Sequence, residues 1–329
     1  MVITKTPLRI SFFGGGTDYP AWFRRHGGAV LSTTIDKYSY ITARHLPPFF
    51  AHKNLVVWSK IEKTKHRDEI EHPSVKKTLE YLNMDGLGIH YDGDLPARTG
   101  LGSSSAFTVG LLHALYALKG EEASKHKIAH DAIHIEQNLL QENVGSQDQV
   151  AAAFGGLNRI EFYPDDTIRV TPLAVDAGRL ERLQQNLMLV FTGFERTASD
   201  VAGEQVQNTH AHAREEELRA MHGIVDKASA VLTSTNGDLD DFGRLLDESW
   251  QIKKTLSSKI TNGSIDELYE RARASGAIGG KLLGAGGGGF MLLYARPEHQ
   301  ARVREALEGL LHVPFRFDTT GSQVIHQTA

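Results

Sequence analysis

The sequence predicts two lobes that each combine helices with strands, an α+β fold. The chain has 329 residues, which is longer than most single domains and favours two of them. Strand patterns are frequent in its first half and helical patterns dominate the second, without the regular strand–helix alternation of a parallel sheet. We therefore expect one domain over 1–180 and a second over 181–329, with no long linker between them.

The composition is that of an ordinary globular chain, with 40% hydrophobic residues, 23% charged residues and a formal net charge of -4. This slight acidity argues against a nucleic-acid partner, which usually requires a basic excess. The absence of cysteine excludes disulfides, thiolate chemistry and zinc–cysteine sites. The N-terminal segment lacks the apolar core of a signal peptide, and no stretch reaches the roughly 20 apolar residues of a membrane span. We therefore expect a cytoplasmic protein that binds no membrane.

Segments rich in β-branched and aromatic residues predict strands in the first half. These strands are expected at 2–13, at 27–46 as one strand or two, and at 55–60 and 86–96, with a hairpin at 157–163 and 168–173. A helix is expected over 72–84, because Val75, Leu79 and Leu82 recur at helical spacing and Pro73 lies near its start. Further helices are expected over 103–119, 121–140 and 147–154.

The second half begins with a predicted buried strand, and long helical patterns follow it. The strand is expected at 186–194 and the helices at 198–234, 238–256 and 264–275. A glycine-rich loop then leads into a strand that ends near residue 295. A helix over 297–311 and a strand over 315–325 complete the predicted lobe.

Glycine is concentrated in a few short loops, which indicates close backbone approach to ligands more than a flexible linker. The stretch "RTGLGSSSA", residues 98–106, opens the predicted helix 103–119. It fits neither the dinucleotide fingerprint, because Ser105 replaces the third glycine, nor the P-loop, because no lysine follows. Gly100 and Gly102 allow close approach, and the serines offer hydroxyls and N–H groups at the positive end of a helix dipole. A simple serine cap explains the same stretch equally well.

Two more glycine loops flank it in the sequence. In "FFGGGTDYP", small residues leave space for a polyhydroxylated ligand, and Asp18 can accept hydrogen bonds from its hydroxyls; a capped tight turn is the alternative. Arg9, on the strand before this loop, is interpreted from its position alone as a solvated arginine. In "KLLGAGGGGF", residues 281–290, four glycines directly precede a strand. Glycine there marks close backbone approach, so we favour a ligand contact over a simple turn.

Two acidic residues lie on neighbouring predicted helices. Glu136 comes late in one helix, and Asp148 lies in the first turn of the next. Ser146 and Gln149 match the capping box, and the helix dipole favours an ionised Asp148, which helps the helix even without any chemistry. The 16 histidines show no spacing with acids that is typical of a zinc site.

In this order and spacing, the three glycine loops resemble the motifs of the GHMP kinases, which include galactokinase, homoserine kinase, mevalonate kinase and phosphomevalonate kinase. "LPARTGLGSSSA" is similar to the second motif, "LLGAGGGGF" to the third and "TPLRISFFGGGTDYP" to the first. The resemblance covers nearly the whole chain. It implies an N-terminal ATP-binding lobe similar to domain 2 of ribosomal protein S5, a ferredoxin-like C-terminal lobe, and a cleft between them for ATP and the acceptor.

The resemblance also implies roles for individual residues. Asp148 would be the catalytic base, and Arg9 would neutralise developing charge and help to hold Asp148 ionised. Mg²⁺ would be held by Ser104 and Glu136. The residues expected at ATP are Arg98, Gly100, Leu101, Gly102, Ser103, Ser104 and Ser105. The residues expected at the acceptor are Gly15, Gly16, Thr17, Asp18, Gly287 and Gly288.

The first motif departs from that of galactokinase, which has Gly-Glu-His-Thr-Asp where this chain has Gly14 to Asp18 as "GGGTD". "FGGGTD" is similar to the branch of heptose 7-phosphate kinases and fucose kinases. "TTIDKYSYI", "GSQDQVAAAFGGLNRIEF" and "FTGFERTASDV" look closest to the heptose phosphate kinases. The implied reaction is transfer of the ATP γ-phosphate to the anomeric hydroxyl of D-glycero-D-manno-heptose 7-phosphate. The product is the 1,7-bisphosphate, used in nucleotide-activated heptose biosynthesis for surface polysaccharide.

Two alternatives remain at this stage: a fucokinase-like kinase of an unphosphorylated sugar, and an ATP-binding regulator without catalysis. The sugar phosphate would be the only partner apart from a possible second copy of the chain. Its phosphate requires basic residues, and the sequence does not choose among the candidates, which are Lys5, Arg24, Arg25, Lys37, Arg44 and Arg196.

Overall fold

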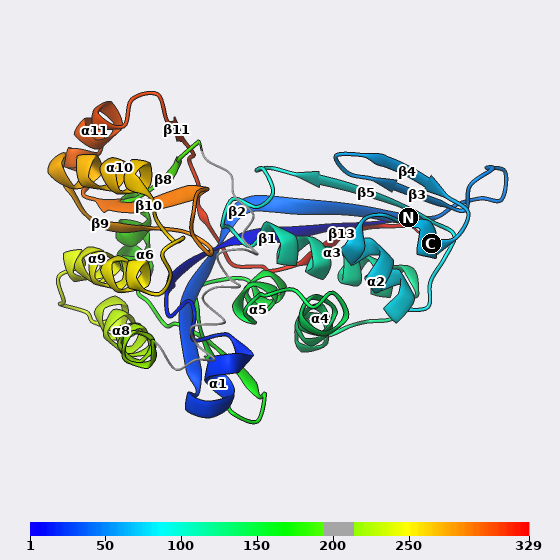
Figure 1. The fold of residues 1–329 in the computed structure, drawn as a ribbon, viewed down its shortest axis with the longest axis horizontal. Coiled ribbons are helices and arrows are strands. Elements are labelled where there is room, and N and C mark those ends of the chain that lie inside the picture. The colour runs from blue at the N-terminus through cyan, green and yellow to red at the C-terminus, as the bar shows by residue number, and fades with distance from the viewer. Residues whose placement is uncertain (194–213, 329) are drawn as a thin grey trace.

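Two sheets form the framework of the computed structural model, which describes residues 1–193 and 214–328 (Figure 1). One sheet has nine strands and the other has four. Helices cover both sheets, so the predicted two-lobed α+β fold is confirmed. The division into 1–180 and 181–329 stays a prediction, and the last two strands of the chain return to the first sheet.

The first sheet has the central order β13-β1-β2-β5-β3-β4; in addition, β12 and β6 each pair with β2, and β7 pairs with β6. Its ladders are antiparallel except for the parallel pair β3–β5. The strands are β1 Val2–Phe13, β2 Gly28–His45, β3 Asn54–Val57, β4 Ile61–Thr64, β5 Leu87–Gly93, β6 Asn158–Phe162, β7 Ile168–Pro172, β12 Phe317–Asp318 and β13 Gln323–Gln327. The predicted hairpin is β6–β7.

The single strand predicted over 315–325 is wrong, because the segment forms two short strands. Gly321, with φ +69°, lies between them in a conformation that favours glycine and turns the chain. β12 pairs with β2, whereas β13 pairs with β1. The two chain ends therefore lie close together at one end of the sheet (Figure 1).

Helices cover one face of this sheet, and α3 is the most buried of them (Figure 1). Most of its side chains are buried, and it packs against β1 and β2 as well as α4 and α5. The helices of this lobe are α1 Pro20–His26, α2 Pro73–Tyr81, α3 Ser103–Leu118, α4 Lys125–Ile133 and α5 Gln147–Phe154, with a 3₁₀ turn at Arg67–Glu69 and a π-helical segment at His134–Leu139. The helix predicted from 121 begins later, because the Ser124 side chain caps Lys127 N–H.

The second lobe has a four-stranded sheet with the order β11-β8-β10-β9 and five described helices, of which α9, α10 and α11 pack on this sheet and α8 packs on α9. The elements are α6 Ala177–Gln185, β8 Leu187–Phe191, α8 Glu215–Thr233, α9 Asp240–Thr255, α10 Gly263–Ala274, β9 Ala277–Leu282, β10 Phe290–Ala295, α11 Pro297–Ala306 and β11 Leu311–His312. The predicted helix 198–234 lies partly outside the described residues, and α8 is its described part. The helix predicted to 311 ends at Ala306, and the chain turns at Gly309 into β11.

Aromatic packing joins the two lobes. Phe12 and Phe13, at the end of β1, contact Phe242 of α9 edge to face, with ring centroids 5.2 and 5.0 Å apart. Such buried aromatic pairs stabilise a fixed arrangement of the elements that carry them. The end of β1 is therefore held directly against the second lobe.

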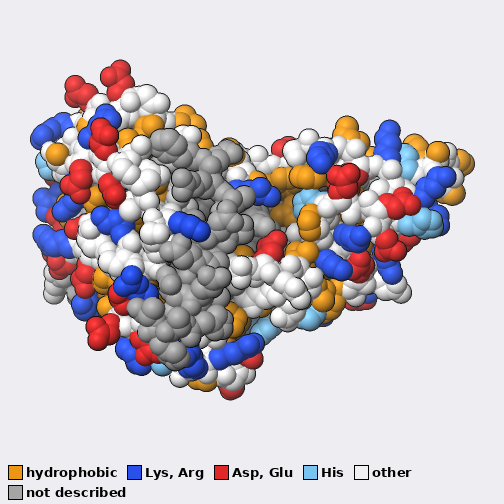
Figure 2. All heavy atoms as spheres, viewed as in Figure 1, with side chains coloured by type: hydrophobic (Ala, Val, Ile, Leu, Met, Phe, Trp, Pro, Cys, Tyr) orange, Lys and Arg blue, Asp and Glu red, His pale blue; other side chains and the backbone are white. Residues whose placement is uncertain are grey.

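The surface agrees with a small net charge. On the face shown in Figure 2, Lys and Arg side chains are interspersed with Asp and Glu. Among the described residues, no helix is both long and apolar enough to cross a bilayer.

Candidate active site

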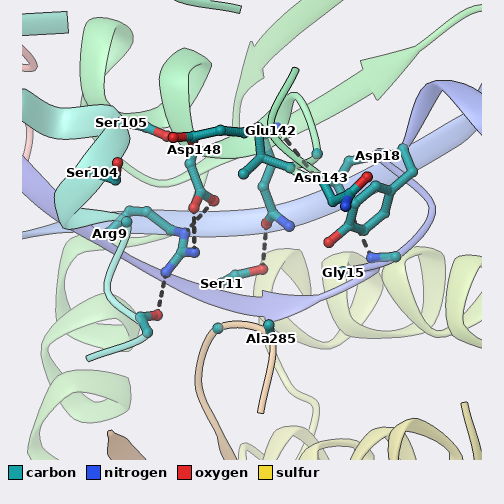
Figure 3. Close-up of a pocket in the computed structure, with 18 of the residues that line it drawn as sticks. Arg9, Ser11, Gly15, Asp18, Ser104, Ser105, Glu142, Asn143, Asp148 and Ala285 are labelled. Atoms are coloured by element: carbon teal, nitrogen blue, oxygen red, sulfur yellow. Dashed lines mark hydrogen bonds and ion pairs between the residues drawn. The ribbon is translucent and has the colours of Figure 1, made fainter. Parts of the chain in front are cut away.

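A cavity of about 460 Å³ lies where the two lobes meet. The end of β1, the loops before α1, α3 and α5, and residues of α9, β9 and the third glycine loop line it (Figure 3). The predicted site residues that line it are Arg9, Gly15, Gly16, Asp18, Arg98, Gly100, Gly102, Ser103, Ser104, Ser105 and Asp148. The structure does not bring Thr17, Leu101, Glu136, Gly287 or Gly288 to its wall.

Arg9 and Asp148 form a bidentate ion pair in this cavity (Figure 3). Arg9 Nε and one terminal nitrogen donate to the two Asp148 oxygens, each at 2.7 Å. The other terminal nitrogen donates to the Gly100 carbonyl at 2.7 Å. The interpretation of Arg9 as solvated is wrong: α5 and the loop before α3 cover it, and it is 4% exposed. The pair fixes the orientation of the Asp148 carboxylate, which keeps 25% of its side chain accessible.

The N-terminus of α5, which carries Asp148, is capped from a distant part of the chain. Asp18 Oδ2 accepts from Gln147 N–H at 3.3 Å, and the Asp18 carbonyl accepts from Ser146 N–H at 3.0 Å. The predicted capping box is wrong, because the Ser146 hydroxyl instead accepts from Gln137, at 3.1 Å. Burial raises the pKa of the Asp18 carboxyl, while the backbone N–H of Gly16 opposes this shift.

Gly145 makes the contact between Asp18 and α5 possible. A Cβ at this position would lie 1.8 Å from Asp18 Oδ2 and 2.6 Å from its Cγ. We expect Gly145→Ala to lower the free energy of unfolding by about 1–3 kcal/mol, because the buried carboxylate must move. Urea denaturation measures this loss. The matched control is Gly223→Ala in α8, where nothing lies within 4 Å, so that variant should be neutral or slightly more stable. Equal stability of the two variants would contradict the prediction.

The second glycine loop presents an open helix start to the cavity. Gly102, with φ +73°, is the N-cap of α3, so the alternative of a simple serine cap is wrong. The Ser103 hydroxyl accepts from Arg98 N–H at 3.1 Å, and Ser104 is exposed. The first-turn N–H groups have no acceptor within the helix and carry its positive end. This arrangement suits an anion.

Glu136 lies behind that turn and is 1% exposed. Its Oε2 accepts from Ser105 at 2.8 Å and from Gln149 at 2.5 Å, whereas Oε1 has no hydrogen-bond partner among the described residues. The structure thus pairs Glu136 with Ser105, not with the predicted Ser104. Burial raises the pKa of Glu136 to about 7. An unpartnered buried carboxylate oxygen fits a cation that the protein would bind there.

The third glycine loop packs directly on the second, backbone against backbone. A Cβ on Gly284 would lie 2.5 Å from Gly100 Cα, and a Cβ on Gly289 would lie 2.3 Å from the Thr99 carbonyl oxygen. Gly287 N–H donates to the Ile260 carbonyl at 2.9 Å, away from the cavity. Gly284 and Gly289 therefore serve contact between the two loops, and the residues of the third loop at the cavity wall are Gly284 and Ala285.

Sequence reasoning missed two buried lysines that line the cavity. Lys253 of α9 donates to the Leu282 and Gly284 carbonyls at 3.1 and 2.5 Å. Lys281 of β9 donates to the Ser11 and Phe12 carbonyls at 3.0 and 2.9 Å, across the lobes. Burial holds the pKa of Lys281 well below its usual range. The candidates for the substrate phosphate that lie within the described residues are elsewhere, namely Lys5, Arg24, Arg25, Lys37 and Arg44; Arg196 lies outside the described residues.

Burial, with a smaller contribution from Arg9, lowers the pKa of Lys253 from 10.5 to about 7. Between about pH 7 and pH 10.5, Lys253 is protonated in the unfolded chain and neutral in the folded protein. The free energy of unfolding therefore rises as the pH increases above about 7. Relative to Lys253→Met, the wild type should therefore gain up to roughly 1 kcal/mol per pH unit. Urea denaturation of both proteins between pH 6 and 9 measures the difference. Curves that stay parallel over this range would contradict the prediction.

Two models of one protein family match this chain. The model of the GHMP kinases N terminal domain matches residues 72–156, and that of the GHMP kinases C terminal matches residues 228–312. The first match spans α3 and α5, and the second spans Lys253 and the third glycine loop. The chain therefore belongs to the GHMP kinase family and is an ATP-dependent kinase.

Comparison with individual proteins shows which members of the family this chain is similar to. It is 28% identical to D-glycero-alpha-D-manno-heptose 7-phosphate kinase of Campylobacter jejuni, with 92% of each chain covered. It is 25% identical to the bifunctional fucokinase/GDP-fucose pyrophosphorylase of Arabidopsis thaliana, over 92% of this chain but 31% of that protein. The structure of a D-glycero-D-manno-heptose 1-phosphate kinase from Bacteroides thetaiotaomicron shares the fold over 100% of both chains, with a TM-score of 0.81 at 24% identity.

Proposed function

We propose that this ATP-dependent sugar kinase transfers the γ-phosphate of ATP to the anomeric hydroxyl of D-glycero-D-manno-heptose 7-phosphate, giving the 1,7-bisphosphate. The observation that carries this proposal is the bidentate Arg9–Asp148 pair in a cavity that also receives the open first turn of α3. A carboxylate and an anion site in one cavity are what phosphoryl transfer to a hydroxyl requires. The similarity to the Campylobacter jejuni enzyme supports the choice of acceptor.

In this reaction Asp148 accepts the proton of the attacking hydroxyl. Its two oxygens each accept one hydrogen bond from Arg9, which leaves lone pairs for the acceptor. Arg9 holds the carboxylate in one orientation and adds positive charge where negative charge develops. The first-turn N–H groups of Ser103, Ser104 and Ser105 bind the phosphates of ATP, and Arg98 adds charge at the rim.

A carboxylate and a hydroxyl are donors that Mg²⁺ accepts. Glu136 would hold it through Oε1 and Ser104 through its hydroxyl, which requires the buried Glu136 carboxylate to turn from Ser105 toward the cavity. When bound, Mg²⁺ neutralises charge on the phosphate oxygens. Before that, Glu136 must lose the proton that its burial favours.

At the acceptor end, Gly15 and Gly16 leave space beside Asp18, which lines the cavity. Both Asp18 oxygens already accept backbone N–H groups, so it would bind a sugar hydroxyl through its remaining lone pairs. The acceptor's own phosphate would need a cation, and Arg98 in the cavity wall would supply one, whereas burial lowers the pKa of Lys253 and Lys281 and so disfavours their charged forms.

An ADP-release assay over a panel of sugars, each with and without its terminal phosphate, tests the proposal. We expect heptose 7-phosphate to give the highest kcat/KM and free heptose to be much poorer. A preference for L-fucose or another free sugar would instead favour the fucokinase-like alternative, which the similarity to the Arabidopsis protein supports. ATP binding without ADP release on any sugar would indicate a regulator without catalysis.

A further inference from the structure

Gln147, which directly precedes Asp148, is held in one orientation by two contacts. Its backbone N–H donates to Asp18 Oδ2 at 3.3 Å. Its side-chain Oε1 accepts from the Ser11 hydroxyl at 2.6 Å (Figure 3). Ser11 is 5% exposed and Gln147 is 9% exposed, so water does not disorder this pair. In this arrangement the amide oxygen faces Ser11 and the amide nitrogen lies beside Gly15.

The nitrogen end, Nε2, has no acceptor among the described residues, although its side chain is nine-tenths buried. It lies beside Gly15, whose missing Cβ would be 3.6 Å away, and both residues line the cavity. An amide nitrogen at a cavity wall with no acceptor in the described part of the protein is free to donate to a ligand or water in the cavity. This donor is thus prepared for a ligand in the cavity.

We propose that Gln147 determines specificity for the acceptor by donating from Nε2 to the sugar hydroxyl next to the one that Asp148 deprotonates. This inference rests on the proposed function of the same cavity. Gln147 and Asp148 lie in the first turn of α5 and both line the cavity, so one small ligand in the cavity can contact both side chains. A neutral amide donor recognises a hydroxyl oxygen, and a site built for that hydroxyl rejects an analogue that lacks it.

Gln147→Met tests this role, because methionine keeps the length of the side chain and removes the donor. We would measure kcat/KM for the heptose 7-phosphate and for its 2-deoxy analogue with both proteins. The wild type should prefer the parent sugar on the order of tenfold to a hundredfold. In Gln147→Met this preference should shrink to about threefold or less, because the variant loses activity on the parent sugar and little on the analogue. An unchanged preference would overturn the proposal.

Ser11→Ala is the second variant, should Gln147→Met fold poorly. It removes the contact that orients the amide and keeps the donor, so it should give a preference between those of the wild type and Gln147→Met. A Ser11→Ala protein that melts at a lower temperature but keeps the full preference would show that the pair is only structural. If the wild type instead prefers another sugar, the proposed acceptor is wrong, and the same comparison with the 2-deoxy form of that sugar still decides the role of Gln147.

Discussion

Asp148→Asn is expected to reduce turnover on the order of a hundredfold or more while leaving ATP binding largely intact. Asparagine keeps the shape of the side chain but cannot accept the proton of the attacking hydroxyl. Its amide also provides one oxygen where Arg9 now donates to two. Single-turnover measurements with saturating ATP, together with ATP titration by calorimetry, separate the chemical step from nucleotide binding.

Asp131→Asn is the matched control for this experiment. Asp131, in α4, is another buried aspartate, 9% exposed, and accepts from the Tyr81 and Tyr116 hydroxyls at 2.9 and 2.5 Å, away from the cavity. Its substitution should lower stability without affecting the turnover of the folded protein. A normal turnover of Asp148→Asn would remove the assignment of Asp148 as base. An equal loss in both variants would attribute the effect to stability.

The parts of the fold that depend on local sequence could be predicted. The start of α3 follows a glycine turn and its apolar run is continuous, so the predicted 103–119 matches Ser103–Leu118. The helix α6 was missed because its nine residues, Ala177–Gln185, are mostly polar and bury few side chains. The two C-terminal strands were predicted as one strand. They pair with different partners, β2 and β1, and no local sequence pattern indicates this tertiary pairing.

The cavity likewise depends on tertiary contacts that local sequence patterns do not show. The resemblance implied that Arg9 acts beside Asp148, but no local pattern shows this contact, because the two residues are 139 positions apart in the chain. Lys253 and Lys281 were missed because lysine in an amphipathic helix or beside a glycine loop is usually solvated. Only packing between the lobes buries them against backbone carbonyls. The cap of α5 was assigned to Ser146 because the sequence shows nearby residues, whereas Asp18 arrives from the first loop.

Gly100→Ala is expected to have the largest effect on stability among single-atom additions at the cavity. The new Cβ would lie 2.4 Å from the Leu283 carbonyl oxygen and 2.8 Å from its carbon, both backbone atoms of the third glycine loop. In addition, φ is +87°, a region that side chains rarely adopt. We expect a loss of about 2–4 kcal/mol in the free energy of unfolding, the sum of collision and backbone strain.

The matched variant Gly120→Ala separates these two causes. Gly120 also has a positive φ, +73°, but nothing lies within 4 Å of its Cβ position, so it should cost only about 1 kcal/mol of backbone strain. Because the Gly100 carbonyl accepts from Arg9, moving this loop should also disturb the ion pair and weaken ATP binding in Gly100→Ala alone. Urea denaturation and calorimetry with ATP measure both effects. If the two variants lose equal stability and bind ATP alike, the contact between the two glycine loops does not organise the site, and the glycines are needed only for their backbone conformation.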